Sequence, residues 1–355
     1  MSPIGALPPE LLFKIFEFYI SDEIGLPETL LLVCRYWRDA ALHFPTLWSD
    51  IRVPENPPIQ LEKVLAFLQK RCLRSHRAPI YLDLGIYAPI EPIVQIPTLL
   101  ERCVGITIRR TDHWGFIAHL PQLEYLTLAL RPHPPPGLEL RPTAELKNLK
   151  IELPHYLPSC PLQIISHLQS ELELCFSWHA TSRPDLCRIA SAATQLPRLR
   201  LNIVEIPQLD VGLLENSFFH EECIFKQVTH LVLQYADDGL DRIVWHPLET
   251  IKVPKLERLE IWLRHLRTIE GLAQGDYLTV TQLMIVMLPI QSNPSDGSGL
   301  ECEAVLELMQ SLPNLELLEL ATPLEVMTKV QAGLRGRNLC PGLSVIRHHT
   351  CIPSR

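Results

Sequence analysis

Residues 256–261 read Leu256-Glu257-Arg258-Leu259-Glu260-Ile261, and this spacing of aliphatic side chains decides the fold. Similar segments recur every twenty to thirty-five residues or so from residue 80 onward. They lie at residues 80–84, 103–108, 123–128, 146–151, 172–174, 199–203, 228–233, 256–261, 280–285, 315–320 and, in a weaker form, 343–346. Each copy predicts one short strand with its leucines on one face and its intervening residues on the other.

No single copy can bury its own apolar face, so the copies must stack into an array. The pattern resembles a degenerate leucine-rich repeat, which implies an α/β solenoid with a parallel sheet on its concave face. Two return segments are predicted to be helices, one capped by Asp185 and one over residues 301–312. No ladder of asparagines follows the strands, so we expect an irregular array. A generic α/β domain with coincidental leucines is the alternative.

The N-terminal region predicts a different structure. Residues 7–19 read Leu7-Pro8-Pro9-Glu10-Leu11-Leu12-Phe13-Lys14-Ile15-Phe16-Glu17-Phe18-Tyr19, with prolines suited to a first helical turn and an apolar stripe behind them. Two further short helices are predicted, one from Pro27 and one carrying Cys34 and Trp37. Three such helices bury little surface alone, so part of their apolar surface is expected to be covered by a partner.

The order of Leu7-Pro8, then Val33-Cys34-x-x-Trp37, then Pro45-x-Leu47-Trp48 resembles the F-box motif. The resemblance implies binding to the Skp-type adaptor of a cullin-containing SCF ubiquitin ligase. Carried over position by position, it assigns adaptor binding to Leu7, Pro8, Leu11, Ile15, Leu32, Val33, Cys34 and Trp37. Cys34 is expected to be buried. The whole arrangement is similar to the F-box proteins expanded in mushroom-forming fungi, and a helical cap with no partner is the alternative.

Composition narrows the function further. The chain has 355 residues and a net charge of −8, which does not favour nucleic-acid binding. Its ten cysteines include no C-x-x-C pair, and no signal peptide or membrane span is recognisable. We therefore expect reduced cysteines, no metal, no cofactor, no membrane association and a cytoplasmic or nuclear location. No nucleotide-binding or hydrolase motif is present, so no catalytic residue is predicted.

The predicted organisation is an F-box at residues 1–52, a linker helix within 53–78 and the repeats at 79–355. The leading hypothesis is a non-catalytic substrate receptor that presents an unknown target for ubiquitination and proteasomal degradation. Aromatic, histidine and arginine side chains near the concave face are the predicted target-binding anchors. They are Tyr125, His230, Tyr235, Arg258 and Trp262. An interaction scaffold with no role in degradation is the alternative, and an enzyme with an unfamiliar site is a third hypothesis.

Overall fold

The computed structural model describes residues 7–21, 26–53, 60–86, 88–129, 146–153, 162–176, 183–203, 223–235, 251–263, 277–287, 300–322, 324–337 and 339–349. Its contacts divide the chain into two compact units, Met1–Leu146 and Lys147–Arg355, which are described separately. This division lies at neither of the boundaries predicted from the sequence, residues 52 and 78. Those boundaries mark sequence motifs and remain predictions.

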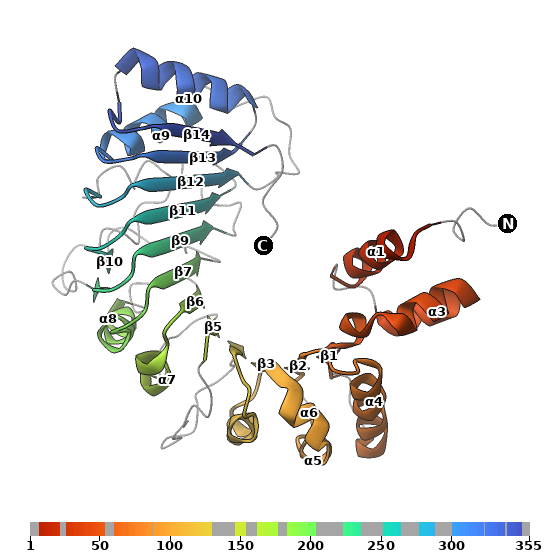
Figure 1. The fold of residues 1–355 in the computed structure, drawn as a ribbon. Helices are drawn as coiled ribbons and strands as arrows, with labels where there is room; N and C mark the ends of the chain where they lie inside the picture. Colours follow the sequence, from red (N-terminus) through yellow and green to blue (C-terminus); the bar gives the residue numbers. More distant parts are fainter. Residues whose placement is uncertain are drawn as a thin grey trace, which may run out of the picture. The chain divides into compact units, whose positions relative to one another are not determined.

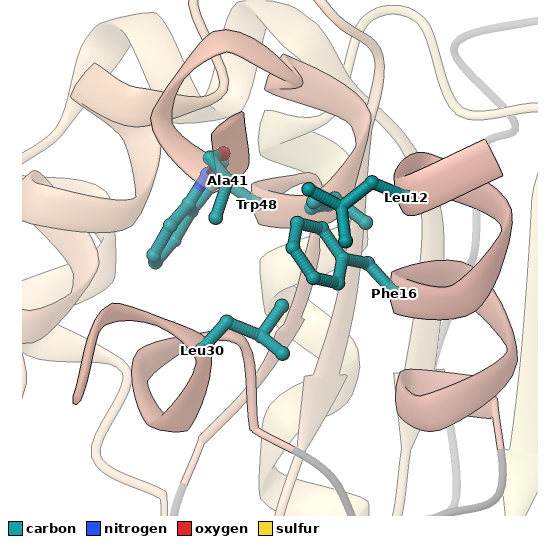
Figure 2. Close-up of a cluster of buried hydrophobic side chains, with 6 residues drawn as sticks. Leu12, Phe16, Leu30, Ala41 and Trp48 are labelled. Carbon is teal, nitrogen blue, oxygen red and sulfur yellow. Dashed lines mark hydrogen bonds between the residues drawn. The ribbon is translucent and has the colours of Figure 1, made fainter. Parts of the chain in front are cut away.

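The first unit begins with the three predicted helices, which are confirmed. They are α1 (Pro9–Ser21), α2 (Pro27–Val33) and α3 (Arg35–His43), followed by the short helix η2 (Pro45–Trp48). Proline stands in the first turn of α2 and of η2, where its missing N–H leaves no helical hydrogen bond unmade. A buried apolar cluster joins all four elements, as Figure 2 shows. It consists of Leu12, Phe16, Leu30, Ala41, Leu47 and Trp48.

Four parallel strands follow in the same unit, in the order β1-β2-β3-β4 (Figure 1). The elements are β1 (Asp50–Arg52), α4 (Leu61–Arg74), β2 (Ile80–Leu84), α5 (Glu91–Val94), α6 (Pro97–Arg102), β3 (Cys103–Ile108), η3 (Thr111–His119) and β4 (Tyr125–Ala129). Strand β1 was not predicted. Its three residues are too few to show an alternating pattern, and only the pairing with β2 makes them a strand.

The second unit contains eight parallel strands in the order β5-β6-β7-β9-β11-β12-β13-β14. They are β5 (Asn148–Leu153), β6 (Glu171–Phe176), β7 (Arg198–Ile203), β9 (His230–Tyr235), β11 (Arg258–Leu263), β12 (Gln282–Met287), β13 (Leu317–Ala321) and β14 (Val345–His348). The described helices between them are α7 (Leu162–His167), α8 (Arg183–Ala192), α9 (Leu300–Gln310) and α10 (Leu324–Arg337). Strands β8 (Cys223–Ile224) and β10 (Ile251–Lys252) form a separate parallel pair.

Every predicted repeat copy forms a strand, although most strands begin about two residues later than predicted. Leu256 shows the reason: it is buried, but it lies in a turn in which its N–H donates to the carbonyl of Val253. The strand proper begins at Arg258. In the copies whose strand begins later than predicted, the first aliphatic residue therefore packs beneath the turn. Only the next two aliphatic positions belong to the strand.

The aliphatic positions align from strand to strand across the second unit. Leu201 pairs with Leu233, Leu233 with Ile261, Ile261 with Ile285, and Ile285 with Leu320, and all five side chains are buried. Figure 1 shows α7 and α8 along one side of these strands. The helical N-terminal region followed by parallel strands with interleaved helices confirms the predicted fold class, a leucine-rich-repeat type of solenoid. The side of the strands that faces away from these aliphatic side chains is called the outer face below. The sequence predicts that it is the concave side.

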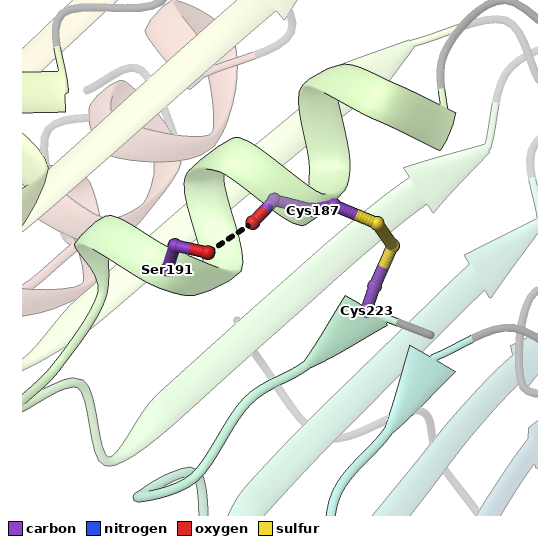
Figure 3. Close-up of a disulfide and its surroundings, with 3 residues drawn as sticks. All are labelled: Cys187, Ser191 and Cys223. Carbon is purple, nitrogen blue, oxygen red and sulfur yellow. Dashed lines mark hydrogen bonds between the residues drawn. A yellow bond between two sulfur atoms is a disulfide. The ribbon is translucent and has the colours of Figure 1, made fainter. Parts of the chain in front are cut away.

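Two sequence predictions about helix α8 are wrong. Helix α8 begins at Arg183, so Asp185 lies inside its first turn and is not the capping residue. Cys187 on α8 and Cys223 on β8 form a disulfide (Figure 3), although all cysteines were expected to be reduced. Their Cα atoms are 4.4 Å apart, within the range that a disulfide spans. Their separation of 36 residues gave no signal, because only the packing of α8 beside β8 brings them together.

Among the described helices, none is both long enough and apolar enough to cross a membrane.

The N-terminal core provides a matched test of stability. Leu12 is fully buried, whereas its neighbour Leu11 is 52 % exposed. We expect Leu12→Ala to lower the free energy of unfolding of the first unit by about 2–5 kcal/mol, because it removes buried methyl groups and leaves a cavity. Leu11→Ala should change it by about 0.5 kcal/mol or less. Denaturant titration followed by tryptophan fluorescence measures both, and equal effects would contradict the described core.

Candidate functional site

Helix α1 divides its apolar residues between two sides. Leu12 and Phe16 point into the core, as Figure 2 shows, and both are fully buried. Leu11, Ile15 and Phe18 follow one another at spacings of four and three residues on another side, where they are 52, 44 and 71 % exposed. An exposed row of large apolar side chains on a helix marks a surface for binding another protein.

The junction of α2 and α3 adds a second exposed apolar segment. Leu32 is 81 % and Val33 55 % exposed at the end of α2. The prediction that Cys34 is buried is wrong, because the residue is exposed between the two helices. Its sulfur accepts a hydrogen bond from the backbone N–H of Trp37 at 3.5 Å and so caps the start of α3. The Trp37 ring is half-buried and packs edge-on against Phe16, with ring centroids 5.1 Å apart.

The start of α1 is held in place by a long-range hydrogen bond. Tyr36 Oη donates to the carbonyl of Leu7 at 2.8 Å. Leu7 is half-buried, and Pro8 is exposed. Of the eight residues predicted to bind an adaptor, Leu7 and Trp37 are therefore half-buried and the other six are exposed. Phe18 is not among these eight residues, but the spacing of Leu11, Ile15 and Phe18 places it on the same exposed side of α1.

Trp48 connects these helices to the rest of the first unit. Its ring is fully buried, and its Nε1–H donates to the carbonyl of Ala41 at 2.8 Å. Two guanidinium groups of α4 lie near the ring, that of Arg74 at 4.3 Å and that of Arg71 at 5.4 Å from its centroid. Arg71 also forms a 2.7 Å ion pair with Glu28 on α2. Burial lowers the pKa of Arg71, and the Glu28 carboxylate opposes this effect.

The residues predicted to bind a target fall in both units. Tyr125 lies on β4 of the first unit and is 39 % exposed. In the second unit, His230 and Arg258 are partly exposed neighbours on β9 and β11. Tyr235 cannot serve as a surface anchor, because it points to the same side as Leu231 and Leu233 and is buried. Burial raises the pKa of its hydroxyl well above the usual value.

Trp262 requires a second correction. It does lie on the outer face, next to Gln234, but only 5 % of it is exposed. It belongs to a buried apolar cluster with Val232, Met284, Val286 and Ala321, all from strands of the second sheet. Alternation along the strand correctly predicted the side to which Trp262 points. It could not predict burial on that side.

Ion pairs between neighbouring strands organise the polar part of this outer face. Glu260 accepts a hydrogen bond from Arg258 Nε at 2.9 Å, and His230 Nε2 and Arg198 Nη2 lie 2.9 Å and 3.9 Å from its carboxylate. Burial alone would raise the pKa of Glu260. The hydrogen bond from His230 and the charges of Arg258 and Arg198 outweigh this effect and lower the pKa to about 2.

A second carboxylate repeats this arrangement two strands away. Glu319 on β13 pairs with Arg347 at 3.1 Å and with Arg258 at 3.6 Å. Arg258 thereby connects Glu260 and Glu319 across the intervening strand β12. The predicted anchors His230 and Arg258 therefore already have partners within the protein. A target would have to bind them as part of a charged network.

Within the residues that the structure covers, no group of three or more histidine, cysteine and acidic side chains could hold a metal ion. Burial raises the pKa of the Cys103 thiol to about 12, and that of Cys175 and of Cys340 to about 11. These thiols are protonated at neutral pH and are poor nucleophiles. The exposed apolar, aromatic and charged side chains described above are of the kinds that bind other proteins.

Comparison with known families agrees with the N-terminal geometry. Residues 4–53 match the family model described as F-box-like, so the chain contains an F-box-like domain there. The match covers the three helices, η2 and β1. No curated protein matches the chain. The family match does not bear on the subgroup expanded in mushroom-forming fungi.

The low pKa of Glu260 predicts a pH-dependent contribution to stability. A carboxylate with a lowered pKa stabilises the fold fully above its unfolded value, near 4.5, and loses this effect as the pH falls through about 2. We expect Glu260→Gln to reduce the free energy of unfolding at pH 6 by an amount on the order of 3 kcal/mol. The difference from the unmodified protein should shrink steadily between pH 4.5 and 2.

Denaturant titrations of both proteins at several pH values measure this difference. Glu257→Gln is the control, because this exposed acid lies in the turn before the same strand. A difference for Glu260→Gln that stays constant down to pH 2 would show that its carboxylate is not specifically stabilised.

Proposed function

We propose that this protein is a non-catalytic substrate receptor of an SCF ubiquitin ligase. The observation that supports this most directly is the F-box-like match at residues 4–53 together with exposed Leu11, Ile15, Leu32 and Val33 on helices that already have a filled core. In this proposal those side chains, with Leu7, Pro8, Cys34 and Trp37, bind a Skp-type adaptor and through it a cullin.

The proposed contribution to ubiquitination is positional. The adaptor holds the receptor in the ligase, and the outer faces of the strands hold a target protein, so the target's effective concentration at the ubiquitin-carrying enzyme rises. Trp48 and the Glu28–Arg71 pair fix α4 and the first strand to the F-box helices. A rigid connection of this kind supports such a function, because a loosely tethered target would spend less time within reach.

The proposal places the protein in the cytoplasm or nucleus, where the ligase and the proteasome operate. Thiol-reducing systems there keep most protein cysteines reduced. The Cys187–Cys223 disulfide is therefore an exception to what that environment favours.

Adaptor binding can be tested with two exposed leucines in the same unit. Leu32 on α2 is 81 % exposed, and Leu73 on α4, outside the F-box-like segment, is 76 % exposed. After co-expression with a Skp-type adaptor, we expect Leu32→Asp to lower co-purification at least tenfold, because a carboxylate would be buried in an apolar interface. Leu73→Asp should leave co-purification unchanged.

Size-exclusion chromatography of the complexes and thermal unfolding of each variant complete the experiment. These substitutions are preferable to Trp37→Ala, since Trp37 also packs against Phe16 and its loss would weaken the fold. Equal adaptor binding by both leucine variants would refute the proposed interface. Accumulation of a bound partner when the proteasome is inhibited then separates a receptor for degradation from a scaffold.

A further inference from the structure

Four residues of the first unit form a row across its outer face. Asp50 on β1 pairs in register with Tyr81 on β2, Tyr81 with Gly105 on β3, and Gly105 with Tyr125 on β4. Adjacent strands lie about 4.8 Å apart, so the row brings a carboxylate and two aromatic rings close together. All four residues line a groove of about 420 Å³ on this face.

Gly105 allows the two rings to meet. A Cβ atom at this position would overlap Cδ1 of Tyr81, so the Tyr81 ring lies over the glycine. The ring centroids of Tyr81 and Tyr125 are 5.9 Å apart, and their planes are tilted by 47°. Tyr81 is 42 % and Tyr125 39 % exposed. The rings therefore form an aromatic surface that remains open to solvent.

The charges in the groove are unequally compensated. Arg109 donates two hydrogen bonds of 3.0 Å to the carboxylate of Asp83, so these two charges neutralise each other. Asp50 Oδ2 forms only a long ion pair with Arg52 Nη2, at 3.8 Å, and Arg71 Nη1 donates to the backbone carbonyl of Asp50 at 3.5 Å. Burial raises the pKa of Asp50, Arg52 opposes this effect, and Asp83 adds to it.

We propose that this groove binds an arginine or lysine side chain from an extended segment of a target protein. The cation would lie against the electron-rich faces of Tyr81 and Tyr125 and beside the carboxylate of Asp50. A positive ligand fits better than a negative one, because aromatic faces attract cations and the Asp50 carboxylate is paired less closely than that of Asp83. The inference extends the proposed function by naming the chemistry of its target, and it does not require adaptor binding.

A displayed library of random seven-residue peptides tests the inference. The purified full chain should enrich peptides with arginine or lysine about fivefold over the starting library, as one cation–π contact beside a carboxylate would produce. Tyr81→Ala combined with Tyr125→Ala should abolish this enrichment. Asp50→Asn should reduce it while leaving the aromatic surface intact. Gly105→Ala, which displaces the Tyr81 ring, should also reduce it.

Asp39→Asn is the matched control, because this exposed acid lies on α3 and not in the groove. Thermal unfolding confirms that each variant is folded. No preference for basic residues, a preference for acidic or proline-rich peptides, or a basic preference that survives loss of both tyrosines would overturn the inference. Leu32→Asp distinguishes the two proposals: it should still select basic peptides while losing the adaptor.

Discussion

Aliphatic side chains at alternate strand positions, aligned from one strand to the next, hold the second unit of this protein together. Leu201, Leu233, Ile261, Ile285 and Leu320 occupy one such line, and all are buried. A strand shifted by one residue would turn its aliphatic side chains to the wrong face and expose them. The common register therefore fixes which polar side chains reach the outer face, and so determines what that surface can bind.

In the first unit, a single tryptophan links the helices to the strands. Trp48 fills the core beneath α1 and α2, lies beside the guanidinium group of Arg74 and stands two residues before Asp50, where β1 begins. The same residue therefore belongs to the helical core and contacts α4, so it packs the F-box-like helices against α4. The proposed function uses this packing, since a ligase receptor must hold its target at a defined place.

Ion pairs between neighbouring strands order the polar part of the outer face of the second unit. Glu260 and Glu319 each gather basic groups from neighbouring strands, and Arg258 contacts both. The first unit has a different surface, in which Tyr81 and Tyr125 meet across Gly105. The two faces therefore suit different contacts, a charged network on one and an aromatic surface beside a carboxylate on the other.

The sequence by itself determined the F-box-like helices, the strand-forming repeats and the side to which most strand residues point, because these depend on local spacing alone. Only the tertiary structure decided burial and pairing. It buried Trp262 and Tyr235, exposed Cys34, and joined Cys187 to Cys223. Spacing shows where a side chain points relative to its own strand or helix. Whether that side chain meets solvent, a charge or another sulfur depends on segments far away in the chain, whose positions only the folded packing sets.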